Sequence, residues 1–184
     1  ALLLPGMGKV DIKVTTKSPL ASKFVNQGVA QFHGFWFLES ERSFRQAATI
    51  DPECAMAYWG MAIANKENDE RARGFIRQAV QLQDQASARE QKYIKAWAKY
   101  LSVEQEKGKA KKKETKDEAD AKLSEKERDA AQVKKDLRSE SDKAKDLLAD
   151  LEKLILEFPE DIEAKALLCF RLWEGEHEGL RITS

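Results

Sequence analysis

Two stretches of the chain carry the same spacing of large and small apolar residues, one after the other. The stretch Phe24–Gly28 is matched by Tyr58–Ala62, 34 residues later, and Phe44–Ala47 is matched by Ile76–Ala79, 32 residues later. A period of about 34 residues is typical of helix–turn–helix units, which bury their apolar faces by stacking on one another. The spacing therefore favours an all-α solenoid.

Capping residues and prolines divide the chain at the same places. Ser18-Pro19 is a helix start, Asp51-Pro52 is a helix stop, and Ser87-x-x-Glu90 is a capping box. Hydrophobic periodicity predicts helices over about residues 18–33, 38–50, 53–65 and 87–101, and a further helix that includes residues 72–80. Another helix is expected to end at Phe158. The last helix is expected after Pro159, with Ile162, Leu168, Cys169 and Leu172 on its apolar face. The chain beyond Gly175, with His177, is expected to be a loop.

Residues 1–17 are expected to form an extended N-terminal segment. Val10, Ile12 and Val14 alternate with polar residues, but this short run has no obvious partner strand. The first residues, Ala1–Gly6, lack the basic region and the long apolar region of an intact signal peptide.

The matched residues resemble the tetratricopeptide repeat (TPR) family, in which small residues let two antiparallel helices approach closely. The first unit supplies Phe24, Gly28, Ser40, Phe44, Ala47 and Pro52, and the second supplies Tyr58, Met61, Ala62 and Ala79. The stretch Asp51–Gly60 resembles bacterial, often exported, proteins of this family. The resemblance covers about residues 18–101 and 145–173. It implies TPR-like repeats over residues 18–103 and a periplasmic or exported location, although the sequence itself leaves the compartment unknown.

One segment differs sharply from the rest in composition. Residues 104–146 hold 27 charged residues out of 43, and no aromatic residue lies between Tyr100 and Phe158. We expect the helix that begins at Ser87 and its antiparallel partner to extend into a charged helical hairpin arm here, a coiled coil with a heptad seam through Leu123, Leu137 and Leu151. The alternative is a disordered loop over about residues 104–122. Residues 147–184 are expected to form the return helix and an incomplete last repeat.

Composition and motifs argue against several classes of function. The formal net charge is zero, which disfavours binding to nucleic acid. The sequence also has no window of 18 apolar residues, the length that a membrane-spanning helix needs. Cys54 and Cys169 are not spaced as a metal site, and no partners converge on His33. We therefore expect no enzyme activity, no catalytic residue, no metal and no cofactor.

The remaining prediction is a scaffold that binds a protein or peptide. The TPR resemblance implies a concave groove lined by the first helix of each repeat. Its residues here are Val25, Val29, Phe32, His33, Met56, Trp59, Ile63 and Lys66. A partner could also associate with the exposed helix over residues 162–173. The alternatives are an accessory domain of a larger exported enzyme or redox assembly, and, more weakly, a nucleic-acid-associated arm.

Overall fold

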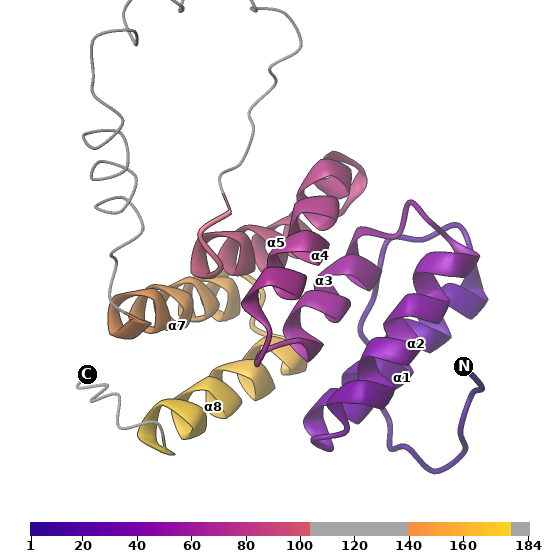
Figure 1. The fold of residues 1–184 in the computed structure, drawn as a ribbon, viewed down its shortest axis with the longest axis horizontal. Coiled ribbons are helices and arrows are strands. Elements are labelled where there is room, and N and C mark those ends of the chain that lie inside the picture. The colour runs from indigo at the N-terminus through magenta and orange to yellow at the C-terminus, as the bar shows by residue number, and fades with distance from the viewer. Residues whose placement is uncertain (104–139, 178–184) are drawn as a thin grey trace, which may run out of the picture.

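The computed structural model describes residues 1–103 and 140–177, and this part of the chain is all-α, without a strand (Figure 1). Its elements are α1 (Pro19–His33), α2 (Phe37–Ile50), α3 (Ala55–Ala64), α4 (Asp69–Leu82), the 3-10 turn η1 (Gln83–Gln85), α5 (Ala88–Tyr100), α7 (Glu140–Glu157) and α8 (Ile162–His177). The predicted charged arm lies largely outside the described residues, and so do Leu123 and Leu137 of its heptad seam.

The helices pack as neighbours in the chain. The pairs are α1 with α2, α3 with α4, and α5 with α7, and α8 lies along α7 (Figure 1). The predicted caps are present: the Ser18 hydroxyl accepts a hydrogen bond from the N–H of Ala21, and Ser87 and Glu90 form a reciprocal capping box. Phe44, which is fully buried, belongs to the core that joins the pairs.

The prediction that the fifth helix runs on into the arm is wrong, because α5 ends at Tyr100. The N–H of Val103 donates to the carbonyl of Ala98, and the N–H of Ser102 donates to that of Lys99. With Ser102 at φ 55°, this is a Schellman turn, which satisfies the last carbonyls of the helix and turns the chain away. In α7, Leu147, Leu151 and Leu154 are buried.

The predicted apolar face of the last helix is wrong for three of its four residues, since only Leu168 packs against the core, half-buried. Ile162 is 74% exposed, Leu172 is 40% exposed and Cys169 is exposed, whereas Ala164 and Leu167 are buried. The helix also continues through Gly175 to His177, where we predicted a loop. Hydrophobic periodicity did not identify the buried face of α8 because that face includes a charged residue, Glu174. Its carboxylate faces inward and forms ion pairs with Lys66 and Arg171.

Candidate functional site

The N-terminal segment crosses the helical array as an extended strap, which we define as residues 9–17. Its side chains alternate in burial, with Ile12 only 3% exposed, Val10 and Val14 half-buried, and Asp11 and Lys13 exposed. This is the period of two of an extended chain that lies with one face on a core. The alternation predicted an extended segment without an obvious partner strand, and within residues 1–103 and 140–177 the strap packs on helices.

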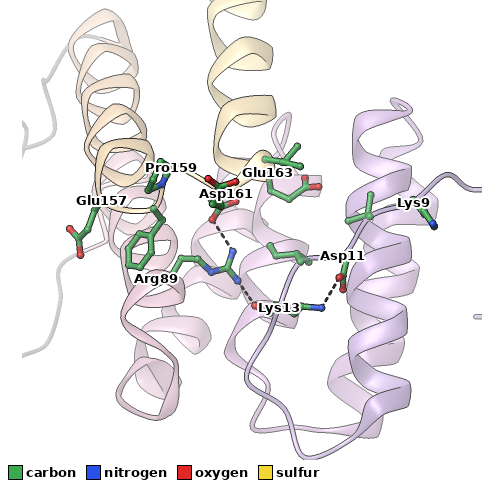
Figure 2. Close-up of a pocket in the computed structure, with 13 residues that line it drawn as sticks. Lys9, Asp11, Lys13, Arg89, Glu157, Pro159, Asp161 and Glu163 are labelled. Carbon is green, nitrogen blue, oxygen red and sulfur yellow. Dashed lines mark hydrogen bonds and ion pairs between the residues drawn. The ribbon is translucent and has the colours of Figure 1, made fainter.

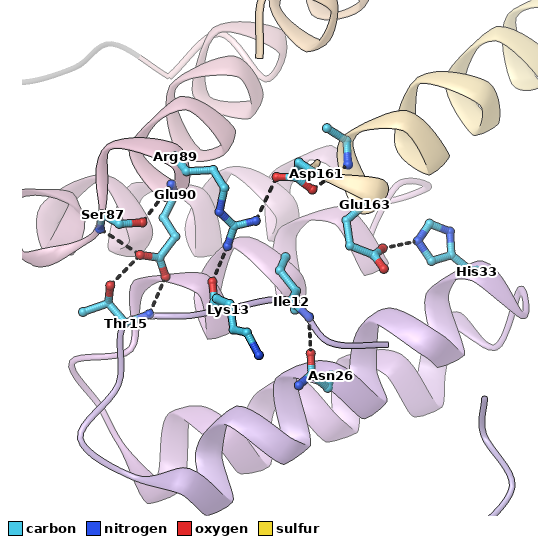
Figure 3. Close-up of polar contacts among 11 residues, drawn as sticks. Ile12, Lys13, Thr15, Asn26, His33, Ser87, Arg89, Glu90, Asp161 and Glu163 are labelled. Carbon is cyan, nitrogen blue, oxygen red and sulfur yellow. Dashed lines mark hydrogen bonds and ion pairs between the residues drawn. The ribbon is translucent and has the colours of Figure 1, made fainter. Parts of the chain in front are cut away.

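Side chains of the helices hold the main chain of the strap (Figure 3). The Asn26 side chain of α1 accepts the N–H of Ile12 at 2.9 Å. From α5, the guanidinium of Arg89 donates to the carbonyl of Lys13, and the carboxylate of Glu90 accepts the N–H of Thr15 at 2.6 Å. Because these contacts use main-chain atoms, they depend on the extended conformation more than on the side chains of the strap.

We call the four side chains that hold the strap, those of Asn26, Asp51, Arg89 and Glu90, the clasp. Glu90 has a second role in this clasp. Its carboxylate also accepts the hydroxyl of Thr15 at 2.5 Å and the N–H of Ser87 at 2.7 Å, the latter as part of the capping box. The residue is only 1% exposed, and a buried carboxylate requires such donors to offset its lost hydration. The strap and the first turn of α5 therefore share one buried acceptor.

Asp51, at the end of α2, anchors the last part of the strap. Its carboxylate accepts the hydroxyl of Thr16 and the N–H of Lys17, the latter at 2.7 Å. The hydroxyl of Thr16 above all, and then the N–H groups of Lys17 and Glu53, hold the pKa of Asp51 below its usual range, although burial opposes them. The carboxylate thus reaches across from the helix stop to the start of α1.

The strap is also connected to α8 through one ion pair. Arg89 donates to Asp161 at 2.8 Å, and Asp161 in turn accepts the N–H of Ala164 in the first turn of α8. The guanidinium lies 5.7 Å from the ring centroid of Tyr93, and both charged side chains are mostly shielded from water. Arg89 therefore links the strap, α5 and the beginning of α8 (Figure 3).

The eight residues predicted to line an open groove lie mostly inside the chain. Six of them are buried, with at most 4% of each side chain exposed: Val25, Val29, Phe32, Met56, Trp59 and Ile63. Trp59 packs edge-on against Tyr93 and Trp97 of α5, and Phe32 packs edge-on against Phe170 of α8. A partner could reach these six side chains only if parts of this chain moved away.

The two polar residues of the predicted groove pair with α8. His33 lies 2.8 Å from the carboxylate of Glu163, and the ammonium of Lys66 lies 2.8 Å from that of Glu174. Lys66 also lies over the ring of Phe37. Their contacts with α8 position that helix against α1 and the end of α3, so both residues have a structural role in the chain itself.

An open groove does exist beside the strap. It has a volume of about 840 Å³ and lies between strap residues 9–13 and the segment 157–163 that joins α7 to α8 (Figure 2). Arg89 lines it between these two walls. No sequence pattern predicts this groove, because its walls are about 145 residues apart in the chain and have no shared motif. The sequence pattern predicted Glu90 as part of a helix cap and Asp51 as part of a helix stop, and it predicted no contact of either residue with the strap.

The described residues hold no cluster of three or more His, Cys, Asp or Glu side chains that could bind a metal ion. Both cysteines are free thiols, with Cys54 buried and Cys169 exposed. Over residues 1–103 and 140–177, we find no helix with the length and apolar character needed to cross a bilayer.

Comparison with known proteins gives no assignment. No family model, no curated protein and no solved structure matches this chain.

Proposed function

We propose that this chain is a non-catalytic scaffold, a TPR-like helical solenoid that binds an extended segment of a partner protein. The observation that carries the proposal is the clasp on the strap. Asn26, Asp51, Arg89 and Glu90, from three parts of the array, hold an extended polypeptide by its main chain. An array with these contacts is suited to hold extended peptides of more than one sequence.

The paired arrangement of the helices supports the TPR-like part of the proposal. Gly28 of α1 and Gly60 of α3 both lie against the ring of Phe44 in α2, so bare glycines allow the close approach of three helices. Small residues that admit a large neighbouring side chain are what the repeat pattern requires. The surface near the α1–α2 turn adds a second area for contact, since Phe35, Trp36 and Leu38 are each more than half exposed.

A test in trans asks whether the clasp accepts a peptide that is not connected to it. In the full chain, Ile12→Asp places a charge at a buried strap position and should release the strap. A synthetic peptide with the sequence of residues 9–18 should then bind this variant, as measured by calorimetry, and should bind the unaltered chain at least about tenfold more weakly because its own strap competes. Ile12→Val, which keeps the strap apolar, is the matched control.

Hydrogen exchange of the strap amides, together with circular dichroism of the helices, verifies the release. Loss of protection at Thr15 and Lys17 with retained helicity is the expected result, as both amides donate to the clasp. The proposal fails if the released chain does not bind the peptide. It fails equally if Ile12→Asp leaves the strap amides protected, because the strap would then not depend on this contact.

A further inference from the structure

One edge of the strap faces the groove. In an extended chain the N–H and C=O groups of successive residues point to opposite sides. The N–H of Ile12 points to Asn26 on α1, whereas the carbonyl of Lys13 and the N–H of Thr15 point to Arg89 and Glu90 on α5. The main-chain groups of Asp11 and the N–H of Lys13 must therefore point to the same side as α5, where the groove begins.

These groups on that edge lack partners. Among residues 1–103 and 140–177, no hydrogen bond involves the N–H or C=O of Asp11 or the N–H of Lys13. Asp11 and Lys13 line the open groove of about 840 Å³, which is large enough for a peptide of several residues. A row of unpaired N–H and C=O groups that faces such a space is the arrangement to which an added strand binds.

The opposite wall of the groove carries negative charge. Residues 157–163 include Glu157, Glu160, Asp161 and Glu163, with no lysine or arginine among them. Glu160 is exposed and forms no ion pair with the residues that the structure describes. The other three carboxylates of this wall are paired, Glu157 with Lys92, Asp161 with Arg89 and Glu163 with His33, so Glu160 is the wall carboxylate that can meet a ligand. The lining thus favours a ligand with basic side chains.

The same wall has an apolar part. Ile162, the first residue of α8, is 74% exposed and lines the groove together with Phe158 and Pro159. The side chains of a strand laid along the strap would alternate as those of the strap do, so every second one would face this apolar part. Side chains at the positions between them would point to the other face of the strand, and basic groups there would lie within the electrostatic field of Glu160.

We propose that this groove binds an extended partner segment of alternating apolar and basic residues, which adds as a strand to the edge of the strap at Asp11 and Lys13. The inference rests on the proposed function, that the chain binds extended segments, and it names the site and the chemistry of the partner. The two binding modes differ in one respect that an experiment can detect. Strand addition requires the strap to be bound to the clasp, whereas binding of a peptide in the clasp requires the strap to be released.

The experiment uses the full chain and an acetylated, amidated hexapeptide of alternating valine and lysine. Calorimetry and amide NMR should show saturable binding, with shifts at the amides of Asp11 and Lys13. Glu160→Lys should weaken binding about fivefold or more, since it replaces a charge attraction by a repulsion. Glu152→Lys, at an exposed position of α7 outside the groove, should change the affinity less than about twofold. The hexapeptide of valine and glutamate should not bind.

Methylation of the peptide nitrogens tests the main-chain pairing. A peptide N-methylated at every second residue in the register that faces the strap should lose binding, and the peptide methylated in the other register should keep it. Equal binding by both peptides, or an unchanged affinity in Glu160→Lys, would overturn the proposed site. Absence of binding by the unmodified valine–lysine peptide would overturn it as well.

The strap variant separates this inference from the proposed function. In Ile12→Asp the valine–lysine peptide should no longer shift the amides of Asp11 and Lys13, even if it enters the vacated clasp, and the variant should gain binding of the peptide of residues 9–18. If only the second peptide binds, the scaffold function stands and the added strand is wrong. If neither peptide binds any form of the chain, both proposals fail.

Discussion

The ring of Phe44 in α2 lies directly against the Cα of Gly60 in α3, so closely that a Cβ added to Gly60 would be 2.2 Å from the ring. Gly28 of α1 meets the same ring from another side, where an added Cβ would be 2.9 Å away. Because Phe44 is fully buried, its ring has no space into which it could move. This contact sets how closely the first three helices pack.

Gly60→Ala should therefore destabilise the chain by about 3 kcal/mol, and Gly28→Ala by about 1–2 kcal/mol, because overpacking forces side chains or helices apart. Urea unfolding followed by circular dichroism measures both. Gly74→Ala, in α4, is the matched control, since nothing lies within 4 Å of an added Cβ there. It should stabilise the chain by about 0.5–1 kcal/mol through helix propensity. Equal effects at Gly60 and Gly74 would contradict this account of the packing.

Ser102 is an exposed residue with a φ of 55°, in the left-handed region that favours glycine. Ser102→Gly should raise the free energy of unfolding by about 1 kcal/mol, since it removes the steric cost of the turn that ends α5. Ser102→Ala should give no such gain. Thermal unfolding of the three chains is the measurement, and a stabilising alanine would show that strain at this residue is not the cause.

The two faces of α8 should differ in their tolerance of truncation. Leu167 is 2% exposed and Leu172 is 40% exposed. Leu167→Ala should cost about 2–4 kcal/mol through lost burial and the cavity left behind, and Leu172→Ala less than about 1 kcal/mol. Chemical denaturation provides both values. The reverse order would support the face that the sequence pattern predicted.

The two cysteines should react at very different rates with a thiol reagent at pH 8. Cys169 is exposed and should react at once, whereas Cys54 is fully buried and burial raises its pKa to about 11. Since the thiolate is the reactive form, Cys54 should react only when the structure opens, and its rate should rise with urea concentration. Fast reaction of two thiols in the folded chain would contradict the placement of Cys54 in the core.

The contribution of Asp51 to stability should depend on pH in one direction. Because the hydroxyl of Thr16 lowers the pKa of Asp51 in the folded chain, its stabilising effect is fully present above the unfolded value, about pH 3.9, and is lost as the pH falls through the lower folded value. The difference in unfolding free energy between the unaltered chain and Asp51→Asn should thus be largest above pH 5 and shrink toward pH 2. Thr16→Val should reduce this pH dependence, and a difference that grows on acidification would contradict it.

The helices of the described part could be predicted from local signals, and the candidate site could be predicted only in part. The capping box at Ser87 and the stop at Asp51-Pro52 act within a few residues, so the sequence pattern locates them. Six of the eight predicted groove residues, all of them in α1 and α3, are buried by α5, α8 and the core that includes Ile12. No local signal shows which segment covers an apolar face.

The sequence by itself determined the all-α class of the described residues 1–103 and 140–177, the helix starts at Ser18 and Ser87, and the alternating burial of the N-terminal segment, because caps, prolines and hydrophobic periodicity act over short distances. Only the tertiary structure decided that this segment is held by Asn26, Arg89 and Glu90, that Glu174 faces inward, and that a groove opens beside Asp11. Those features join residues up to about 150 positions apart, and such contacts arise from the packing of whole helices.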